Sequence, residues 1–336
     1  MTLKQSLTKA VLACAVALPV LSFAQKPLEE TTMAIPATSL SFTVSYIADD
    51  LDLWAKHGMK VESKIVRGVG ALNAVISKNM EFTQSSGSSF TRAAARGQRM
   101  LAIATTIDRP FAQIALRKDL ADAGGFDAAK PLAERAKLLK DRTIAVDSVN
   151  SVVHAYLRLI AIAGGVDPNA IKITPMEASS MAAAMAAGKI DGFAMTLPWA
   201  LGPVLDGKAV MLANGLAGDP GDLVPFAHEL VVTQPETCAK KKQLCEAMGK
   251  VFIDAARYIH ADPAGTQAIL AKRFPSLSPA VLSAAVEQLR GATPRDARVS
   301  EAHLLNVERY NVRAGLLKEE EAVKGVADLF TNDYVR

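Results

Sequence analysis

Hydrophobic and polar positions along this chain form short units that run from an apolar strand through a polar turn into an amphipathic helix. In the clearest unit, residues 143–146 predict a buried strand, residues 147–150 a turn, and Ser151 the start of a helix that ends at Gly164 and Gly165. A turn of this kind leaves backbone N–H groups at a helix N-terminus, where anions and polar ligands bind. The unit therefore predicts a ligand-binding turn.

Two upstream stretches repeat the pattern. Residues 64–76 and 82–97 each pass from a strand through glycines or serines into a helix. On their own, Ser148, Asn150 and Ser151 would be interpreted as helix caps, which is their commonest role. Three such turns on parallel strands would converge at the carboxyl ends of their sheets, so the repetition favours a cleft lined by helix N-termini.

The remaining elements suggest two α/β lobes. Further strands are expected at residues 39–45, 59–66, 100–105, 171–174 and 190–195. Residues 111–117 and 226–233 are apolar and extended, which predicts two crossings between the lobes. We expect a mobile segment before residue 39, and helices from Gln243 to the end of the chain. These helices are interrupted at Pro263, Pro275, Pro279, Pro294 and Gly315.

The first 24 residues have the pattern of a cleavable secretory signal. Lys4 and Lys9 form a basic start, and Ser22 to Ala24 form a small-residue cleavage site. The apolar run at residues 10–20 is shorter than the roughly 20 residues that span a bilayer. We therefore expect cleavage after Ala24, a periplasmic location and no stable membrane insertion.

The composition narrows the choice of partners. The chain has 336 residues, half of them hydrophobic, which is enough for two lobes of ordinary domain size. Its formal charge of +4 falls to +2 once Lys4 and Lys9 leave with the signal, because no acidic residue precedes Gln25. So small an excess argues against a nucleic-acid partner. Trp54 and Trp199 are the only tryptophans.

Two of the three cysteines remain after the signal, which contains Cys14. Cys238 and Cys245 in an oxidising compartment favour a disulfide. An unbroken helix would hold their Cα atoms about 10 Å apart, which is too far for a bond. A disulfide therefore requires the chain to turn between them, as Pro235 and residues 240–242 allow. A metal site at this pair lacks nearby histidines, and we expect neither a metal nor a cofactor.

The sequence offers little catalytic chemistry. It contains no G-x-S-x-G elbow, no H-E-x-x-H motif and no tight cluster of histidine and acid. His57 fits a helix end, and His228 lies near the second crossing, where it would either contact ligand or be structural. Arg67 and Arg109 are candidate anion partners, although one of them is expected to form only a surface or lobe-to-lobe ion pair.

Five short motifs resemble one family of binding proteins. They are LDLWAKHGMKVE at residues 51–62, RGVGALNAVIS at 67–77, SSGSSFTRAAARG at 85–97, AAGKIDGF at 186–193 and ARYIHADP at 256–263. Their order resembles the sulfonate, nitrate and thiamine-precursor group of ABC-transporter substrate-binding proteins, which have a type II periplasmic binding fold. One departure from that pattern is Asp52, which stands where the family usually has a glycine.

The resemblance implies two α/β lobes, each a mostly parallel sheet flanked by helices, joined by two crossing strands that act as a hinge. After a signal at residues 1–24, lobe 1 comprises residues 25–112 and 228–336, and lobe 2 comprises residues 113–227. Carried over from the family and joined to the turns above, the expected ligand-binding residues come from both lobes. They are Ser45, Tyr46, Arg67, Gly68, Val69, Gly70, Ser86, Gly87, Ser88, Thr106, Ser148, Asn150, Ser151, Thr196, Trp199 and His228.

These expectations describe a monomeric, non-enzymatic protein that captures a small organic anion, a sulfonate or a carboxylate with or without an aromatic body, and passes it to an ABC permease. Nitrate and a neutral pyrimidine remain open as ligands. The rival interpretations are an exported enzyme with a dispersed triad, which geometry alone would reveal, and a periplasmic sensor module.

Overall fold

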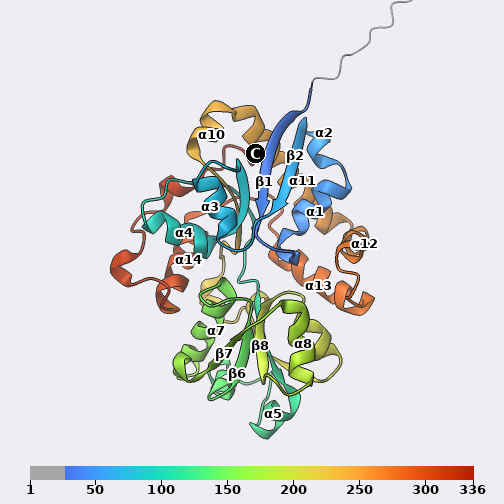
Figure 1. Ribbon diagram of the computed structural model, residues 1–336, viewed down its shortest axis with the longest axis vertical. Coiled ribbons are helices and arrows are strands. Elements are labelled where there is room, and N and C mark those ends of the chain that lie inside the picture. Colours follow the sequence, from blue (N-terminus) through green and yellow to red (C-terminus); the bar gives the residue numbers. More distant parts are fainter. Residues whose placement is uncertain (1–26) are drawn as a thin grey trace, which may run out of the picture.

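Two five-stranded sheets, each covered by helices, form the upper and lower lobes of the protein (Figure 1). The computed structural model describes residues 27–336. The expected signal at residues 1–24, its cleavage site after Ala24 and Cys14 lie outside the described residues. No helix in the described part of the chain is both long and apolar enough to cross a membrane.

The first sheet holds β1 (Glu29–Ile35), β2 (Met59–Ile65), β3 (Phe82–Ser86), β4 (Leu101–Ile107) and β10 (Glu229–Thr233). Their order in space is β2-β1-β3-β10-β4. β1 runs parallel to β2 and β3, whereas β10 is antiparallel to both of its neighbours, β3 and β4. The last strand of the chain therefore lies inside the sheet formed by the first four.

The second sheet holds β5 (Ala112–Arg117), β6 (Thr143–Val146), β7 (Lys172–Pro175), β8 (Gly192–Thr196) and β9 (Ala209–Asn214) in the order β7-β6-β8-β5-β9. β6 is parallel to β7 and β8, and β5 is antiparallel to β8 and β9. Each sheet is thus mostly built from parallel strand-turn-helix units and contains one antiparallel strand from a crossing. This confirms the predicted two-lobed α/β fold.

Fourteen α-helices in the described residues cover these sheets. They are α1 (Thr43–Asp50), α2 (Leu53–Lys56), α3 (Gly70–Ile76), α4 (Gly87–Ala95), α5 (Lys118–Ala123), α6 (Leu132–Ala136), α7 (Val152–Ala163), α8 (Ala178–Ala186), α9 (Leu201–Leu205), α10 (Pro235–Lys240), α11 (Lys242–Ala261), α12 (Pro263–Arg273), α13 (Pro279–Ala292) and α14 (Glu301–Arg313).

The strand β10 shows how the apolar core is divided between the two faces of the first sheet. Val231 packs on one face with Met248 and Phe252 of α11, because successive side chains of a strand point to opposite faces. Leu230 and Val232 pack on the other face, in a cluster that continues into the second lobe. Burial of these side chains fixes the register of β10, since a slip of one residue would exchange the two faces.

The chain crosses between the lobes twice, and the two crossings are hydrogen bonded to each other. The first passes from β4 to β5 through residues 108–111, and the second returns from β9 to β10 through residues 215–228. The N–H of Phe226 donates to the carbonyl of Asp108 at 2.7 Å, and the N–H of His228 donates to that of Ile107 at 3.0 Å. The hinge is therefore a paired connection.

The prediction for the first elements of the fold was wrong. Residues 29–35 form β1, where a mobile segment was predicted, and the predicted strand at residues 39–45 is a 3₁₀ turn followed by α1. Residues 39–45 are buried on all sides, so their alternating composition carries no information about a sheet face. Ser39 starts the turn because its Oγ accepts the N–H of Ser41 at 3.2 Å.

Two further elements differ from expectation. β9 was not predicted, and the chain after Arg313 contains 3₁₀ turns and irregular backbone in place of a final helix. The other predicted strands, and the helices from residue 242 to residue 313, lie within a few residues of their expected positions. Asp52, where the resemblance predicts a glycine, has a φ of 52°. This is the left-handed region that glycine enters most easily, so a glycine would fit this position.

Cys238 and Cys245 form the expected disulfide, with their Cα atoms 5.6 Å apart. α10 ends at Lys240 and α11 begins at Lys242, so the chain turns at Lys241 as the bond requires.

Replacing Cys238 and Cys245 together by alanine should lower the free energy of unfolding by about 2.5 kcal/mol, because the disulfide removes loop entropy from the unfolded chain. Urea denaturation of the oxidised protein measures the difference. A reductant should destabilise the native protein by a similar amount and leave the double variant unchanged. Equal sensitivity of the two proteins to reductant would contradict the assignment.

Candidate functional site

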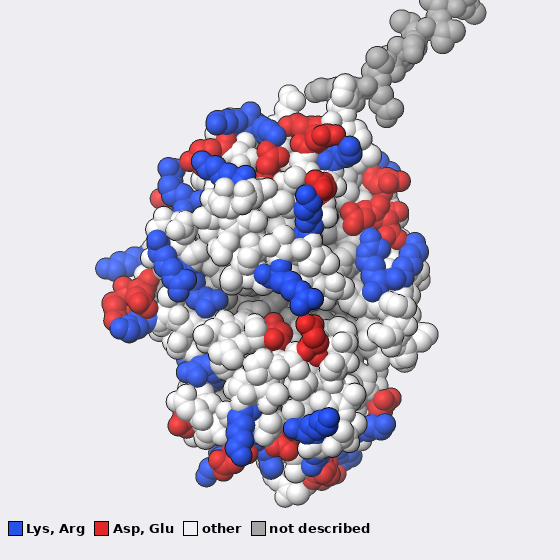
Figure 2. Space-filling view, viewed as in Figure 1, with Lys and Arg blue, Asp and Glu red and all other residues white. Residues whose placement is uncertain are grey.

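Turns from both lobes meet because the parallel strands of each sheet end towards the other lobe. β1, β2 and β3 of the first sheet, and β6, β7 and β8 of the second, each lead into a turn and then a helix. Two contacts join these turns across the lobes, Ser39 with Thr196 and Arg67 with Glu177. Figure 2 shows the groove between the lobes, with a basic group on its upper rim and acidic groups below it. This interlobe groove is the candidate site.

The contact between Ser39 and Thr196 lies where β1 and β8 end. Their hydroxyl oxygens are 3.3 Å apart, and both side chains are buried. The N–H of Ser39 also donates to the phenol oxygen of Tyr46 at 3.3 Å. Burial raises the pKa of Tyr46 to about 12, so the phenol stays neutral and keeps its O–H as a donor. The point where the lobes meet therefore carries uncharged hydroxyl groups from both lobes.

A pocket of about 290 Å³ opens beside Tyr46 on the first lobe. It is lined by Ile35, Ala37, Thr38, Ser45, Tyr46, Asp49, Ser63, Lys64, Ile65 and Arg273. The guanidinium of Arg273 lies 4.9 Å from the centre of the Tyr46 ring and 2.6 Å from a carboxylate oxygen of Asp50. Its charge is therefore already balanced within the lobe. The hydroxyl of Ser45 donates to Gln84 at 2.6 Å.

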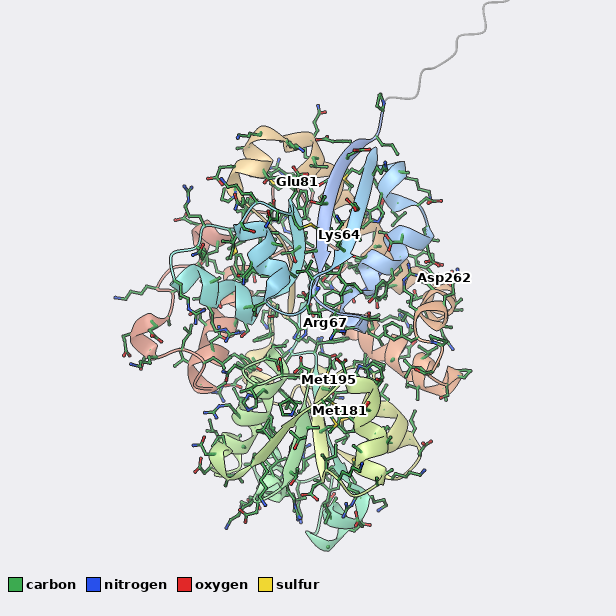
Figure 3. All side chains as sticks on the ribbon, viewed as in Figure 1. Lys64, Arg67, Glu81, Met181, Met195 and Asp262 are labelled. Carbon is green, nitrogen blue, oxygen red and sulfur yellow. A yellow bond between two sulfur atoms is a disulfide. The ribbon has the colours of Figure 1, made fainter. Side chains whose placement is uncertain are left out.

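The turn after β2 supplies the upper rim of the groove. Arg67 lies at the level where the lobes meet (Figure 3), and its guanidinium is 3.2 Å from Glu177 at the end of β7. Both side chains are highly exposed, at 85% and 75%, so this ion pair contributes little stability. Gly68, Val69 and Gly70 follow, and Gly68 takes a φ of 58°, which favours glycine. Arg67 thus forms the expected lobe-to-lobe pair.

The turn after β3 is divided between the groove and the interior of the lobe. Ser86 caps α4, since its Oγ accepts the N–H of Ser89 at 3.2 Å. Gly87 is buried against the second crossing, where an added Cβ would lie 2.1 Å from the carbonyl oxygen of Ala227. Ser88 is fully buried and donates to Asn311 of α14 at 2.5 Å. Only the start of this turn faces the groove.

The turn after β6 is more fully paired internally than its sequence indicates. Asp147 accepts the N–H of Ser148 at 2.8 Å and the hydroxyl of Ser151 at 2.5 Å. The N–H of Asn150 donates to Nδ1 of His154 at 2.9 Å, and Ser151 caps α7 by accepting the N–H of His154. Several of the amides expected to be free are therefore occupied, and Asp147 adds a negative charge next to them.

Trp199 and two methionines form an apolar surface on the lower lobe. Met176, Met195 and Trp199 are half-buried and pack on a cluster that contains Met181 and Phe193. Met195 and Met181 lie below the groove in Figure 3. The indole N–H of Trp199 is buried and has no hydrogen-bond partner within residues 27–336. This surface therefore offers one unused donor beside apolar contacts.

Thr106 and His228 lie inside the first lobe and the hinge, away from the groove. Thr106 is buried and accepts from Gln84 at 3.4 Å. His228 is buried, its ring packs on Phe111, and its Nδ1 accepts the N–H of Phe111 at 3.3 Å. Burial lowers the pKa of His228 to about 3, so the ring is neutral. This arrangement ties the two crossings together.

The structure thus separates the expected site residues into two groups. Those on the groove side are Tyr46, Arg67, Gly68, Val69, Gly70, Ser86, Ser148, Asn150, Ser151, Thr196 and Trp199. Those buried in the lobe or hinge are Ser45, Gly87, Ser88, Thr106 and His228, of which Ser45 also lines the pocket beside Tyr46. Within the described residues, no three His, Cys, Asp or Glu side chains are grouped closely enough to hold a metal ion.

Sequence reasoning missed four groove residues: Ser39, Asp147, Met176 and Glu177. Ser39 resembles the other turn residues in being a polar residue soon after a strand, here one whose last three residues, Met33 to Ile35, are apolar. It was overlooked because the strand was placed at residues 39–45 instead of 29–35. Asp147 lay within the predicted turn, but only its hydroxyl and amide neighbours were interpreted as ligand contacts.

Replacing His228 by asparagine should flatten the dependence of stability on pH. The native ring stays neutral while the unfolded one gains a proton below about pH 6.5, so the unfolded state binds more protons and stability falls with acidification. Between pH 6 and 4, the free energy of unfolding of the native protein should fall about 1.4 kcal/mol per pH unit more steeply than that of His228→Asn. Denaturant titrations at several pH values measure both slopes, and parallel curves would contradict the buried neutral histidine.

Comparison with known proteins agrees with this architecture. Residues 39–266 match the NMT1/THI5-like family. No curated protein gives a significant match to the sequence.

Solved structures resemble the chain over nearly its whole length. The alkanesulfonate-binding protein SsuA from Xanthomonas axonopodis pv. citri, bound to MOPS, is 18% identical with a TM-score of 0.69, covering 91% of this chain and 99% of its own. The periplasmic aliphatic sulphonate-binding protein SsuA from Escherichia coli is 16% identical with a TM-score of 0.67, covering 90% and 96%.

The periplasmic nitrate-binding protein NrtA from Synechocystis PCC 6803 is 14% identical with a TM-score of 0.64, covering 87% of this chain and 83% of its own. At these identities the likeness concerns the fold. Because the family match spans more than half of the sequence, the chain belongs to the NMT1/THI5-like family and has the two-lobed type II fold of periplasmic binding proteins.

Proposed function

We propose that this protein captures a small organic anion in the groove between its lobes and delivers it to an ABC permease. The observation that carries the proposal is the meeting of turns from both lobes at Ser39 and Thr196, beside the unused indole N–H of Trp199. A ligand held there contacts both lobes, so its binding energy favours the closed arrangement. The periplasm is the proposed location, in keeping with the solved relatives and the expected signal.

The charges around the groove favour a ligand with a single negative charge. Arg67 is paired with Glu177 and Arg273 with Asp50. Asp147 places a carboxylate at the start of α7. A multiply charged anion would be repelled by this carboxylate, whereas one charged head can be held by hydroxyl and N–H dipoles. A sulfonate or a carboxylate has this charge.

The apolar surface favours a ligand with an organic body. Met176, Met195 and Trp199 lie below the groove and can cover carbon atoms attached to the anionic head. Nitrate has no such body, and a neutral pyrimidine would not need the dipoles. We therefore favour an alkyl or aryl sulfonate or carboxylate over nitrate and a pyrimidine as the ligand. We also propose that the ligand is bound without chemical turnover.

The paired crossings supply the hinge for capture. We propose that lobe 1 comprises residues 25–112 and 228–336 and lobe 2 comprises residues 113–227. Residues 108–111 and 215–228 would then absorb the change in backbone angles while each sheet moves as a unit. A monomer suffices for this mechanism because both binding surfaces belong to one chain.

Thermal unfolding with a panel of compounds tests the proposed function. The mature protein is first unfolded and refolded to remove bound ligand, then heated with ethanesulfonate, benzenesulfonate, benzoate, nitrate or a pyrimidine. A ligand at a hundred times its dissociation constant stabilises the native state by about 2.7 kcal/mol. We expect a raised midpoint with a sulfonate or carboxylate. A shift with pyrimidine alone, or turnover of a bound compound, would contradict anion capture.

Replacing Trp199 by phenylalanine should weaken binding of the best organic anion of this panel about tenfold, since it removes one N–H donor to a charged oxygen and keeps the aromatic surface. Isothermal calorimetry measures the change. Trp54→Phe is the matched control, because the N–H of Trp54 already donates to Asp49 at 2.7 Å. Its affinity should equal that of the native protein. If Trp199→Phe and the native protein bind with equal affinity, the indole N–H does not contact the ligand.

A further inference from the structure

Glu229 is a buried acid at the sheet edge that faces the interlobe groove. It is the first residue of β10, and its Cα pairs with those of Ser86 and Ile107, the last residues of β3 and β4. Because β10 runs antiparallel to these strands, its beginning lies at their carboxyl ends. Glu229 thus lies at the same sheet edge as the turn between β3 and α4.

Its neighbours place Glu229 on the polar part of one sheet face. Side chains alternate along a strand, so Glu229 projects to the same face as Val231, whose cross-strand partner is Gln84. Gln84 accepts the hydroxyl of Ser45, which lines the pocket of the first lobe, and donates to Thr106. Glu229 therefore shares a face with a chain of polar groups that leads to this pocket.

The carboxyl group of Glu229 is not satisfied by the protein. The residue is 3% exposed, and Oε1 is buried without a hydrogen-bond partner within residues 27–336. Burial raises the pKa of the Glu229 carboxyl group well above its ordinary value, which favours the protonated, neutral form. A neutral carboxyl carries one O–H donor and an acceptor oxygen. Leaving such a group unpaired is costly, which points to a partner that is not part of the chain.

We propose that the neutral carboxyl group of Glu229 contacts the ligand in the interlobe groove and donates its O–H to the anionic oxygen. The assignment rests on the proposed capture of an organic anion. It explains how such an anion is held where Arg67 and Arg273 are already paired with acids. A protonated acid adds a donor to a charged oxygen without adding a charge to the interior.

This role makes ligand affinity depend on pH. Sulfonates, benzoate and nitrate remain ionised between pH 6 and 9, so any change over this range comes from the protein. Affinity should be constant while Glu229 is protonated. Above the pKa of the ligand-free carboxyl it should fall, by about tenfold per pH unit, because binding must then take up a proton.

Three variants test the proposal with ethanesulfonate, benzoate and nitrate as probes in calorimetry at pH 6 to 9. Glu229→Gln keeps a neutral N–H donor, so it should bind within about threefold of the native protein and lose the pH dependence. Glu229→Leu has no donor and should bind about tenfold more weakly. Glu308→Gln is the matched control, since Glu308 of α14 is also buried with one unpartnered oxygen, while its other oxygen accepts from Val323. It should behave as the native protein.

The possible outcomes separate this proposal from the proposed function. Undiminished binding by Glu229→Leu would overturn the role of Glu229 and leave anion capture standing. Weak binding by Glu229→Gln, with native affinity that rises with pH, would show that the ionised carboxylate favours binding and would also overturn the proposal. If the native protein binds none of the three probes, both the role of Glu229 and the proposed capture of an organic anion are contradicted. If Glu229→Leu does not fold, the pH profiles decide: a flat profile for Glu229→Gln beside a native affinity that falls with pH supports the proposal, and two profiles of the same shape overturn it.

Discussion

The fold depends on the pairing of its two crossings. Backbone hydrogen bonds from Phe226 to Asp108 and from His228 to Ile107 hold the outgoing and returning segments together. Each crossing continues into an antiparallel strand that lies within the sheet of the lobe it enters, β5 in the second and β10 in the first. The parallel strands of both sheets then end towards each other. This arrangement places the turns of both lobes around the groove and buries His228 in the hinge.

The groove combines uncharged donors with arginines that are already paired with acids, and this combination limits the ligands it can hold. Ser39, Thr196 and Tyr46 supply hydroxyl groups at the meeting of the lobes. The arginines nearby are engaged by Glu177 and Asp50, so they add little net charge. Binding in such a site relies on fixed dipoles that need no rearrangement when an anion enters.

Much of the fold can be predicted from the sequence wherever the hydrophobic period changes from that of a strand to that of a helix. Residues 143–164 are the clearest case, because β6, the turn and α7 lie where predicted. The sequence misleads at residues 29–45. Residues 39–45 are all buried, so their alternating composition does not mark a sheet face, and the first strand was placed ten residues too late. Ser39 was missed for that reason. Glu229 lies inside an apolar run, and only the register of β10 shows that this residue starts at the sheet edge facing the groove.

The most direct test of the account is the distance between the lobe rims with and without ligand. Val69 and Val149 are exposed on opposite lobes, and the native cysteines of the mature chain are joined in the disulfide. Spin labels on Val69→Cys and Val149→Cys therefore report the interlobe distance by pulsed electron resonance. The account predicts that a saturating organic anion narrows the distribution to one short distance, that of the arrangement in which Ser39 contacts Thr196. An unchanged distribution at saturation would contradict capture by closure.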